Sequence, residues 1–230
     1  MNKKIVLLVF CALFIILTSC GRSKEENSVP KINATEKAVD YKNNDGMGFT
    51  VRADGTLEVS LSGNNTEVTV PKKHKGIKVT SIGKSAFRMS DVTKVTLPDT
   101  IEKIDSHAFA FATSLKEINI PEGVTEIGNN AFMGCMSLEN IALPENVETI
   151  GMYAFDGSGL TEITLPSNVT KIYDYAFAEC EYLKNVTFEG TTVEIADTSF
   201  QRSSDVFFYV QKGSDVIGYA KSKGIEYKIK

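Results

Sequence analysis

The stretch that decides the fold is IGNNAF at residues 127–132, followed by LENIALP at residues 138–144. Its Ala-Phe pair recurs along the chain, and Ser199-Phe200 is a last, altered copy. The repeated phenylalanines are Phe87, Phe109, Phe132, Phe155, Phe177 and Phe200. Successive members of this set are 22 or 23 residues apart. Because a fixed period of this length gives one coil per repeat, the sequence predicts a solenoid.

Each repeat carries two apolar segments that predict two short strands. In one copy Leu115, Ile118 and Ile120 precede a proline, and their spacing places them on the inner side of a strand. A second apolar pair, Val124 and Ile127, predicts another strand on a second wall. We expect the phenylalanines to fill the centre of the coils and to stack on one another. The predicted fold is a β-rich solenoid of the α/β repeat class, a right-handed superhelix with short parallel strands.

Both ends of the repeat region have sequences that predict caps. Residues 48–61, with Asp54-Gly55 between two apolar segments, predict a β-hairpin ahead of a first solenoid strand at 67–71. After the repeats we expect a strand at 206–210, a helix at 215–222 capped by Ser214, and a last strand at 225–229. The predicted organisation is an N-terminal β-hairpin cap at 45–65, the solenoid at 66–205 and a C-terminal strand and helix cap at 206–230.

The beginning of the chain resembles the leader of a bacterial lipoprotein. Lys3 and Lys4 precede an uncharged run at residues 5–17 that is too short to span a membrane. Leu17-Thr18-Ser19-Cys20 then resembles the lipobox, whose cysteine is acylated and becomes the first mature residue; an ordinary cleaved signal is the alternative. We therefore expect a signal peptide at 1–19, acyl chains such as palmitate on Cys20, and a lipidated tether at 20–44.

A short charged run follows the expected lipidation site. Lys24-Glu25-Glu26 resembles the acidic export tag that some Gram-negative lipoproteins use to reach the outer face of the outer membrane. A solvated charged linker is the alternative. With the lipobox, this run predicts a protein that is anchored in the outer membrane and faces the cell exterior.

Composition and motif spacing argue against several classes of protein. The formal net charge of −4 lacks the basic field that a nucleic-acid-binding protein needs. Neither His74 nor His107 has a Ser or Cys partner at a fixed spacing, so no catalytic residue is expected. Cys135 and Cys180 share one repeat position two coils apart, too far for a disulfide, and are expected to be buried thiols. We expect no enzyme activity, no cofactor and no metal site.

Aromatic side chains and methionines outside the core pattern are the candidates for binding. Tyr153 and Tyr175 share the position before Ala in adjacent coils, and Tyr173 lies two residues away. The variable turns after the phenylalanines add Phe111, Met133 and Met136. If these residues are exposed together they form an aromatic interaction patch. The alternative is that they only cover the turns.

The repeat pattern, written Ile-x-x-x-Ala-Phe-x-x-Cys-x-x-Leu-x-x-Ile-x-Ile-Pro, resembles the leucine-rich repeats of BspA-type bacterial surface proteins over residues 66–200. The last copy departs from it, with Ser199 for Ala and Glu189 for Pro. The resemblance implies a surface-exposed, non-enzymatic interaction protein, often an adhesin. The predicted function is therefore a cell-surface lipoprotein that binds a protein or glycan ligand in adhesion or protein binding. The alternative is a carbohydrate-binding accessory of a surface uptake system.

Overall fold

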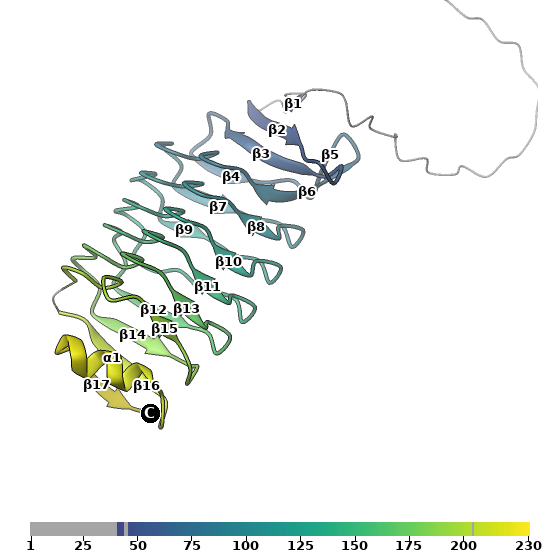
Figure 1. Cartoon of the computed structure of the whole chain (residues 1–230). Coiled ribbons are helices and arrows are strands. Elements are labelled where there is room, and N and C mark those ends of the chain that lie inside the picture. Colours follow the sequence, from purple (N-terminus) through teal and green to yellow (C-terminus); the bar gives the residue numbers. More distant parts are fainter. Residues whose placement is uncertain (1–40, 44–45, 204) are drawn as a thin grey trace, which may run out of the picture. The chain divides into compact units, whose positions relative to one another are not determined.

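The repeats form a stack of coils in the computed structural model, which describes residues 41–43, 46–203 and 205–230 (Figure 1). Each coil passes along a first strand wall, a second strand wall and a wall of turns that carries the Ala-Phe pair. This architecture confirms the predicted β-rich solenoid. The expected signal peptide, Cys20 and the Lys24-Glu25-Glu26 run lie outside the described residues.

The first strand wall consists of two separate sheets. One contains β4 (Glu67–Thr69), β7 (Lys94–Thr96) and β9 (Glu117–Ile118). The other contains β12 (Glu162–Leu165), β14 (Asn185–Phe188), β16 (Phe207–Val210) and β17 (Glu226–Ile229). All of these neighbours pair in parallel, with Val68 opposite Val95 and Val95 opposite Ile118. The register therefore stacks the same repeat positions on one another, as the alignment of the copies predicts.

The second strand wall is one continuous sheet. It begins with β1 (Tyr41–Lys42), β2 (Met47–Val51) and β3 (Leu57–Ser62), which pair antiparallel. The parallel part contains β6 (Ile77–Ile82), β8 (Lys103–Ile104), β10 (Glu126–Ile127), β11 (Thr149–Ile150), β13 (Lys171–Ile172) and β15 (Glu194–Ile195), and β5 (Lys73–His74) pairs with β6. The β2–β3 hairpin thus extends this wall at the N-terminal end, where β6 would otherwise present an unpaired edge.

The repeated phenylalanines form one internal column along the turn wall. Neighbouring rings from Phe87 to Phe200 stack with centroid distances of 4.9–5.4 Å and interplanar angles of 0–19°. The first five rings are fully buried, and Phe200 is 6% exposed. The spacing follows the distance between hydrogen-bonded coils, which is about 4.8 Å. The predicted phenylalanine stack is therefore confirmed.

Backbone hydrogen bonds around the Ala-Phe pairs run in one direction along the stack. The backbone N–H of Phe87 donates to the carbonyl of Ala108 in the next coil, and the N–H of Phe109 donates to Ala131. The backbone N–H groups of Ser85, which precedes the Ala, and of Met89, two residues after the Phe, also donate to the following coil. Each of these turns therefore directs N–H groups toward the C-terminal end of the stack and carbonyl groups toward its N-terminal end.

Two positions in each turn have left-handed backbone conformation. The residue before Ala has φ of 56–60° in five successive coils, where it is Ser85, His107, Asn130, Tyr153 and Tyr175. The residue two after the Phe has φ of 51–67° in six coils and is glycine in only two of them. Such a conformation costs a non-glycine residue roughly 1–2 kcal/mol. At most of these positions, as at Ser85, His107 and Met89, the backbone N–H donates to the next coil.

A column of small residues lies three positions after the phenylalanines. Cys135 Sγ donates to the Phe109 carbonyl at 3.2 Å, and Ser203 Oγ donates to the Phe177 carbonyl at 2.7 Å. Cys180 is similarly placed against Phe155, and both cysteines are free and buried, as predicted. Burial raises the pKa of the Cys135 thiol to about 12 and that of Cys180 to about 11. They are therefore protonated hydrogen-bond donors rather than nucleophiles.

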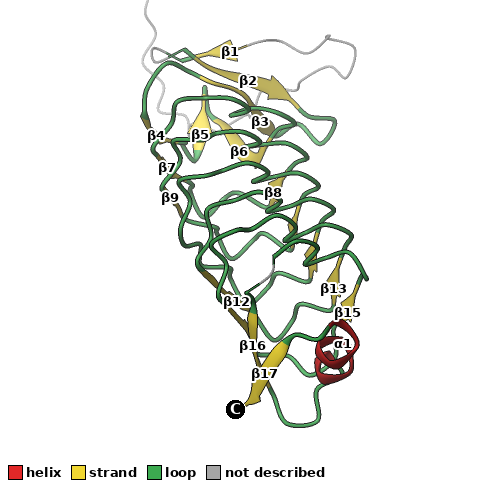
Figure 2. Ribbon diagram, turned by 90° about the vertical axis from the view of Figure 1, so that its left-hand side faces the viewer, coloured by secondary structure: helices red, strands yellow, loops and turns green. Residues whose placement is uncertain are grey.

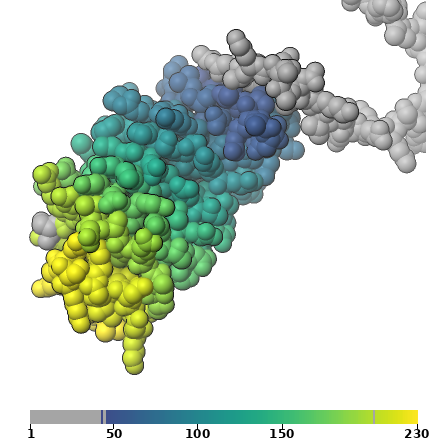
Figure 3. Space-filling model, viewed as in Figure 1, coloured from purple at the N-terminus to yellow at the C-terminus, as the bar shows by residue number. Residues whose placement is uncertain are grey.

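The C-terminal cap contains the helix α1 (Val216–Lys223), which is seen near β17 and β15 (Figure 2). Ser214 Oγ accepts a hydrogen bond from the Val216 N–H, and Gly224 ends the helix with φ of 68°. Tyr219 of the helix stacks against Phe208 of β16 at 6.4 Å. In the space-filling view this cap, in yellow, lies against the last coils (Figure 3).

One expected strand is missing from the first wall. The pattern LENIALP predicts a strand at residues 138–143, but this segment pairs with neither β9 nor β12 as a strand. In the preceding coil, the side chain of Asn119 makes hydrogen bonds to the backbone of the coil before it. Its Oδ1 accepts from the Leu97 N–H and its Nδ2 donates to the Leu97 carbonyl, both at 2.8 Å. A side-chain amide thus occupies the place of a backbone pair just before the coil that lacks the strand.

Candidate functional site

Charged side chains on the strand walls are engaged along the axis of the stack. Lys94 pairs with Glu117 at 2.5 Å, and Lys171 pairs with Glu194 at 3.0 Å. Both pairs join residues that lie opposite one another on neighbouring parallel strands. Solvent screens exposed pairs of this kind, so each contributes little to stability. They stabilise the stacking of coils slightly and engage charges that could otherwise attract a ligand.

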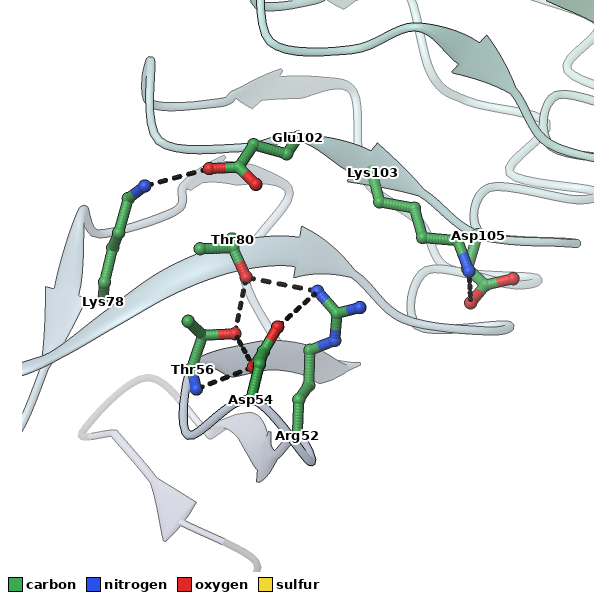
Figure 4. Close-up of polar contacts among 8 residues, drawn as sticks. All are labelled: Arg52, Asp54, Thr56, Lys78, Thr80, Glu102, Lys103 and Asp105. Atoms are coloured by element: carbon green, nitrogen blue, oxygen red, sulfur yellow. Dashed lines mark hydrogen bonds and ion pairs between the residues drawn. The ribbon is translucent and has the colours of Figure 1, made fainter. Parts of the chain in front are cut away.

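The polar residues that join the N-terminal hairpin to β6 likewise make structural contacts (Figure 4). Arg52 Nη1 donates to Thr80 Oγ1 at 3.3 Å, and the hydroxyl groups of Thr56 and Thr80 are 2.8 Å apart. Asp54 accepts hydrogen bonds from the Thr56 hydroxyl and N–H, which hold the pKa of the Asp54 carboxyl below its usual range. These bonds join the hairpin to the first coils rather than form a site.

The tyrosine recess is a concave site on the turn wall. Tyr153 and Tyr175 stack with ring centroids 4.8 Å apart and an interplanar angle of 3°. Beside them is a cavity of about 320 Å³. Its other lining residues are Asp156, Ala178, Glu179, Gln201 and Arg202. The repeat creates this site, because one position of each coil brings the two tyrosines together and the next turn positions supply the polar rim.

The recess carries a carboxylate that the protein does not neutralise. Burial raises the pKa of the Asp156 carboxyl, and the nearby Glu179 carboxylate raises it further. Glu179 itself pairs with Arg202 at 2.7 Å. Within the described part of the chain, the Asp156 side chain has no hydrogen-bond donor or cation as a partner. The recess therefore combines aromatic surface with an unsatisfied acceptor, which suits a ligand that donates hydrogen bonds.

Only two of the six predicted binding residues meet in this recess. Tyr173 is 38% exposed, and its ring lies under the Lys171 ammonium, 5.0 Å from the centroid. Phe111 packs over Gly134, where an added Cβ would lie 2.6 Å from its ring. The remaining two predicted residues, Met133 and Met136, also lie outside the recess. Met133 Sδ accepts a hydrogen bond from Asn130, and Met136 borders a different hollow on the strand wall.

That second hollow, the strand-wall groove, follows the missing strand. It has a volume of about 930 Å³. Its lining includes Lys94, Lys116, Ile118, Met136, Glu139 and Ile141. Met136 is 65% exposed at this groove. The groove is larger than the tyrosine recess but it has no aromatic side chain among its lining residues.

The described residues show neither a metal site nor a membrane span. Among them, no three His, Cys, Asp or Glu side chains gather closely enough to hold a metal ion. No helix in the same residues is long and apolar enough to cross a membrane. Two of the hollows on the described residues, the tyrosine recess and the strand-wall groove, are the candidate sites.

Comparison with known families decides the class of repeat. The BspA type leucine-rich repeat region matches residues 80–206 in six copies. The chain belongs to this family. The BspA-type region begins in β6 and ends just before β16, so it includes the tyrosine recess and the strand-wall groove. No curated protein matches the chain.

Several solved structures are similar to the fold of this chain. A leucine-rich repeat protein from Bacteroides ovatus is 28% identical with a TM-score of 0.66, over 84% of this chain and 53% of that one. The chain therefore spans about half of that protein's length. The T. pallidum leucine-rich repeat protein TpLRR is 24% identical with a TM-score of 0.62, over 82% and 97% of the two chains. The pneumococcal vaccine antigen PcpA is 21% identical with a TM-score of 0.50, over 82% and 49%.

The family pattern did not identify several exposed residues. Met89 is 63% exposed, Met152 is 39% exposed and Tyr182 is 58% exposed. The polar rim of the recess was also missed, although its members recur one or two positions after successive phenylalanines. Reading those turn positions as columns across coils would have found Asp156, Glu179 and Arg202.

Proposed function

We propose that this BspA-type protein binds another macromolecule at the cell surface and that the tyrosine recess is the centre of its binding site. The observation that carries the proposal is the stacked pair Tyr153 and Tyr175 beside the unpaired carboxylate of Asp156. Tyrosine offers a rigid aromatic surface with a polar tip, and such residues supply much of the binding energy of protein interfaces. Adhesion to a protein ligand is the function that this arrangement supports best.

Anchoring to a membrane is a separate part of the proposal. The lipobox resemblance supports acylation of Cys20, and the Lys24-Glu25-Glu26 run supports exposure on the outer membrane. Metabolic labelling with a fatty acid should mark the wild type and leave Cys20→Ser unlabelled. Equal labelling of both proteins would refute the anchor. Replacing Lys24, Glu25 and Glu26 by Ala should hide the protein from external protease, and unchanged cleavage would refute the export tag.

A specific observation keeps a glycan ligand as the second candidate. The recess combines tyrosine rings with Asp156, Glu179 and Gln201, which can accept or donate hydrogen bonds to sugar hydroxyl groups. Arrays of matrix proteins and of polysaccharides, probed with the same protein, separate the two ligand classes. Binding confined to polysaccharides would replace the protein ligand by the glycan.

The binding experiment compares two variants of the full chain. Tyr153→Ser/Tyr175→Ser removes the stack, whereas Tyr182→Ser removes a tyrosine that does not line the recess. Loss of a central aromatic residue costs about 2 kcal/mol or more, or about thirtyfold in affinity. We expect that loss in the double variant alone, after thermal melting has shown that both variants remain folded. Undiminished affinity of a folded double variant would place the site elsewhere.

A further inference from the structure

The first strand wall has an opening in its hydrogen-bonded ladder that the function of the tyrosine recess does not use. Four residue pairs join β12 to β14, but none joins β9 to residues 138–143. On the other side, residues 138–143 keep one backbone bond to the next coil, from the Thr161 N–H to the Glu139 carbonyl at 2.9 Å. Among the described hydrogen bonds, the backbone groups of residues 140–143 have no partner in either neighbouring coil.

The apolar side chains at the opening are less covered than those of the paired coils. Val95 and Ile163, in paired strands, are 2% and 3% exposed. Ile118 and Leu143, on either side of the opening, are only partly buried against the core. The strand-wall groove thus exposes the edge of the core together with unpaired backbone. A second hollow of about 400 Å³ lies on the other side of the same coil, along β12.

The outward side chains of this coil leave the opening accessible. Ala142 occupies a column whose other members are Thr69, Thr96, Asn119, Thr164 and Thr187. It is therefore the smallest side chain in that column. Asn140 stands where neighbouring coils place Glu117 and Glu162. Exposed strand edges are commonly protected by charged side chains, and neither of these two positions carries one.

We propose that this opening is a docking site for an extended peptide segment of a partner protein. Such a segment would lie along the strand-wall groove, pair its backbone with β9 or residues 140–143, and place apolar side chains against Ile118, Met136 and Ile141. An extended polypeptide presents N–H and carbonyl groups at the spacing of a strand and so pairs with several of these backbone groups in register, whereas a lipid chain would leave them unpaired. The proposal goes beyond the tyrosine recess and does not depend on it.

Charge supports the choice of an apolar, uncharged segment. Lys94 and Glu117 at the rim already pair with one another, and Lys116 and Glu139 add one charge of each sign. The groove therefore has no net charge that would select an acidic or a basic partner. Recognition would rest on backbone hydrogen bonds and on contacts with the apolar side chains of Ile118, Met136 and Ile141.

The experiment selects ligands from a phage-displayed library of random linear peptides, with the full chain as bait. Ala142→Arg fills the groove with a long charged side chain, whereas Thr187→Arg places the same side chain in the same column on the paired strand β14. We expect enriched peptides to lose at least tenfold in affinity for Ala142→Arg and to bind Thr187→Arg like the wild type. Binding should also survive Tyr153→Ser/Tyr175→Ser, which separates this site from the recess.

Two further measurements test the mode of binding. Amide hydrogen exchange at residues 140–143 should slow when an enriched peptide is bound, because those N–H groups become paired. N-methylation of alternate peptide residues should abolish binding in one register and spare it in the other. Absence of any enriched peptide, equal affinity for Ala142→Arg, or indifference to N-methylation in both registers would each overturn the proposal.

Discussion

At the residue scale, the left-handed positions before Ala show how the stack constrains single side chains. Asn and Asp adopt this conformation at lower cost than most other non-glycine residues, and Asn130 already occupies it in one coil. His107 has φ of 58°, and its Nδ1 atom is buried without a hydrogen-bond partner among the described residues. This position therefore stores strain that a substitution can release.

His107→Asn should raise the free energy of unfolding by about 0.5–1 kcal/mol, because Asn fits the left-handed backbone at lower cost. His107→Val should lower it, since a β-branched side chain fits this backbone poorly. Urea unfolding of the two variants and the wild type measures both effects. Equal stability of the three proteins would show that the conformation carries no strain.

Asp156 is the residue where stability and binding are expected to oppose one another. Burial raises its folded pKa above the unfolded value of 3.8, so the ionised carboxylate destabilises the fold at neutral pH. Its contribution to stability is greatest below pH 3.8 and is lost as the pH rises through the folded pKa. Asp156→Asn should therefore stabilise the protein at pH 7, and the gain should vanish below about pH 3.8.

The control for this prediction is Asp91→Asn, which changes an exposed carboxylate in the first coil. Thermal melting across this pH range should show no comparable gain for the control. If Asp156 accepts a hydrogen bond from the ligand, its Asn variant should also bind less tightly despite its higher stability. If Asp156→Asn is more stable and binds with unchanged affinity, Asp156 does not contact the ligand and the tyrosine rings alone form the site.

At the element scale, α1 contains two glycines with opposite roles. Gly218 lies inside the helix, and an added Cβ there would meet nothing within 4 Å. Gly224 ends the helix in the left-handed conformation, and its N–H is directed at the carbonyls of Ala220 and Lys221. The same substitution should therefore act in opposite directions at the two positions.

Gly218→Ala should stabilise the protein by about 0.5–1 kcal/mol, because alanine loses less conformational entropy in a helix. Gly224→Ala should destabilise it by about 1 kcal/mol, because the end of the helix requires a positive φ. Chemical denaturation followed by circular dichroism measures both. Changes of the same sign would contradict this account of the C-terminal cap.

At the scale of the whole molecule, each coil contacts mainly its two neighbours, so damage should spread along the stack. Phe132→Ala removes the middle of the phenylalanine column and should cost about 3–5 kcal/mol. Hydrogen exchange should rise most in the coils that carry Phe109 and Phe155 and least in the two caps. A uniform rise over the described residues would instead indicate a single cooperative unit.

The solenoid could be predicted from the sequence because the 22- or 23-residue spacing of the phenylalanines can be read without knowing which coils are in contact. It did not reveal the left-handed positions, since they are occupied by Ser, His, Asn and Tyr rather than by glycine in every copy. It also predicted a strand at 138–143, because LENIALP keeps the apolar alternation while the pairing depends on the neighbouring coil. The recess was found only in part, as its polar rim arises from residues that meet across coils.

The one-way hydrogen bonds of the turn wall give the stack an electrical polarity. Aligned peptide dipoles add, as in an α-helix, so the wall has a partial negative charge at its first coil and a partial positive charge at its last. Inserting a coil would lengthen the dipole without changing the charge at either end. A chain of this type can therefore gain or lose repeats while keeping the same two terminal coils.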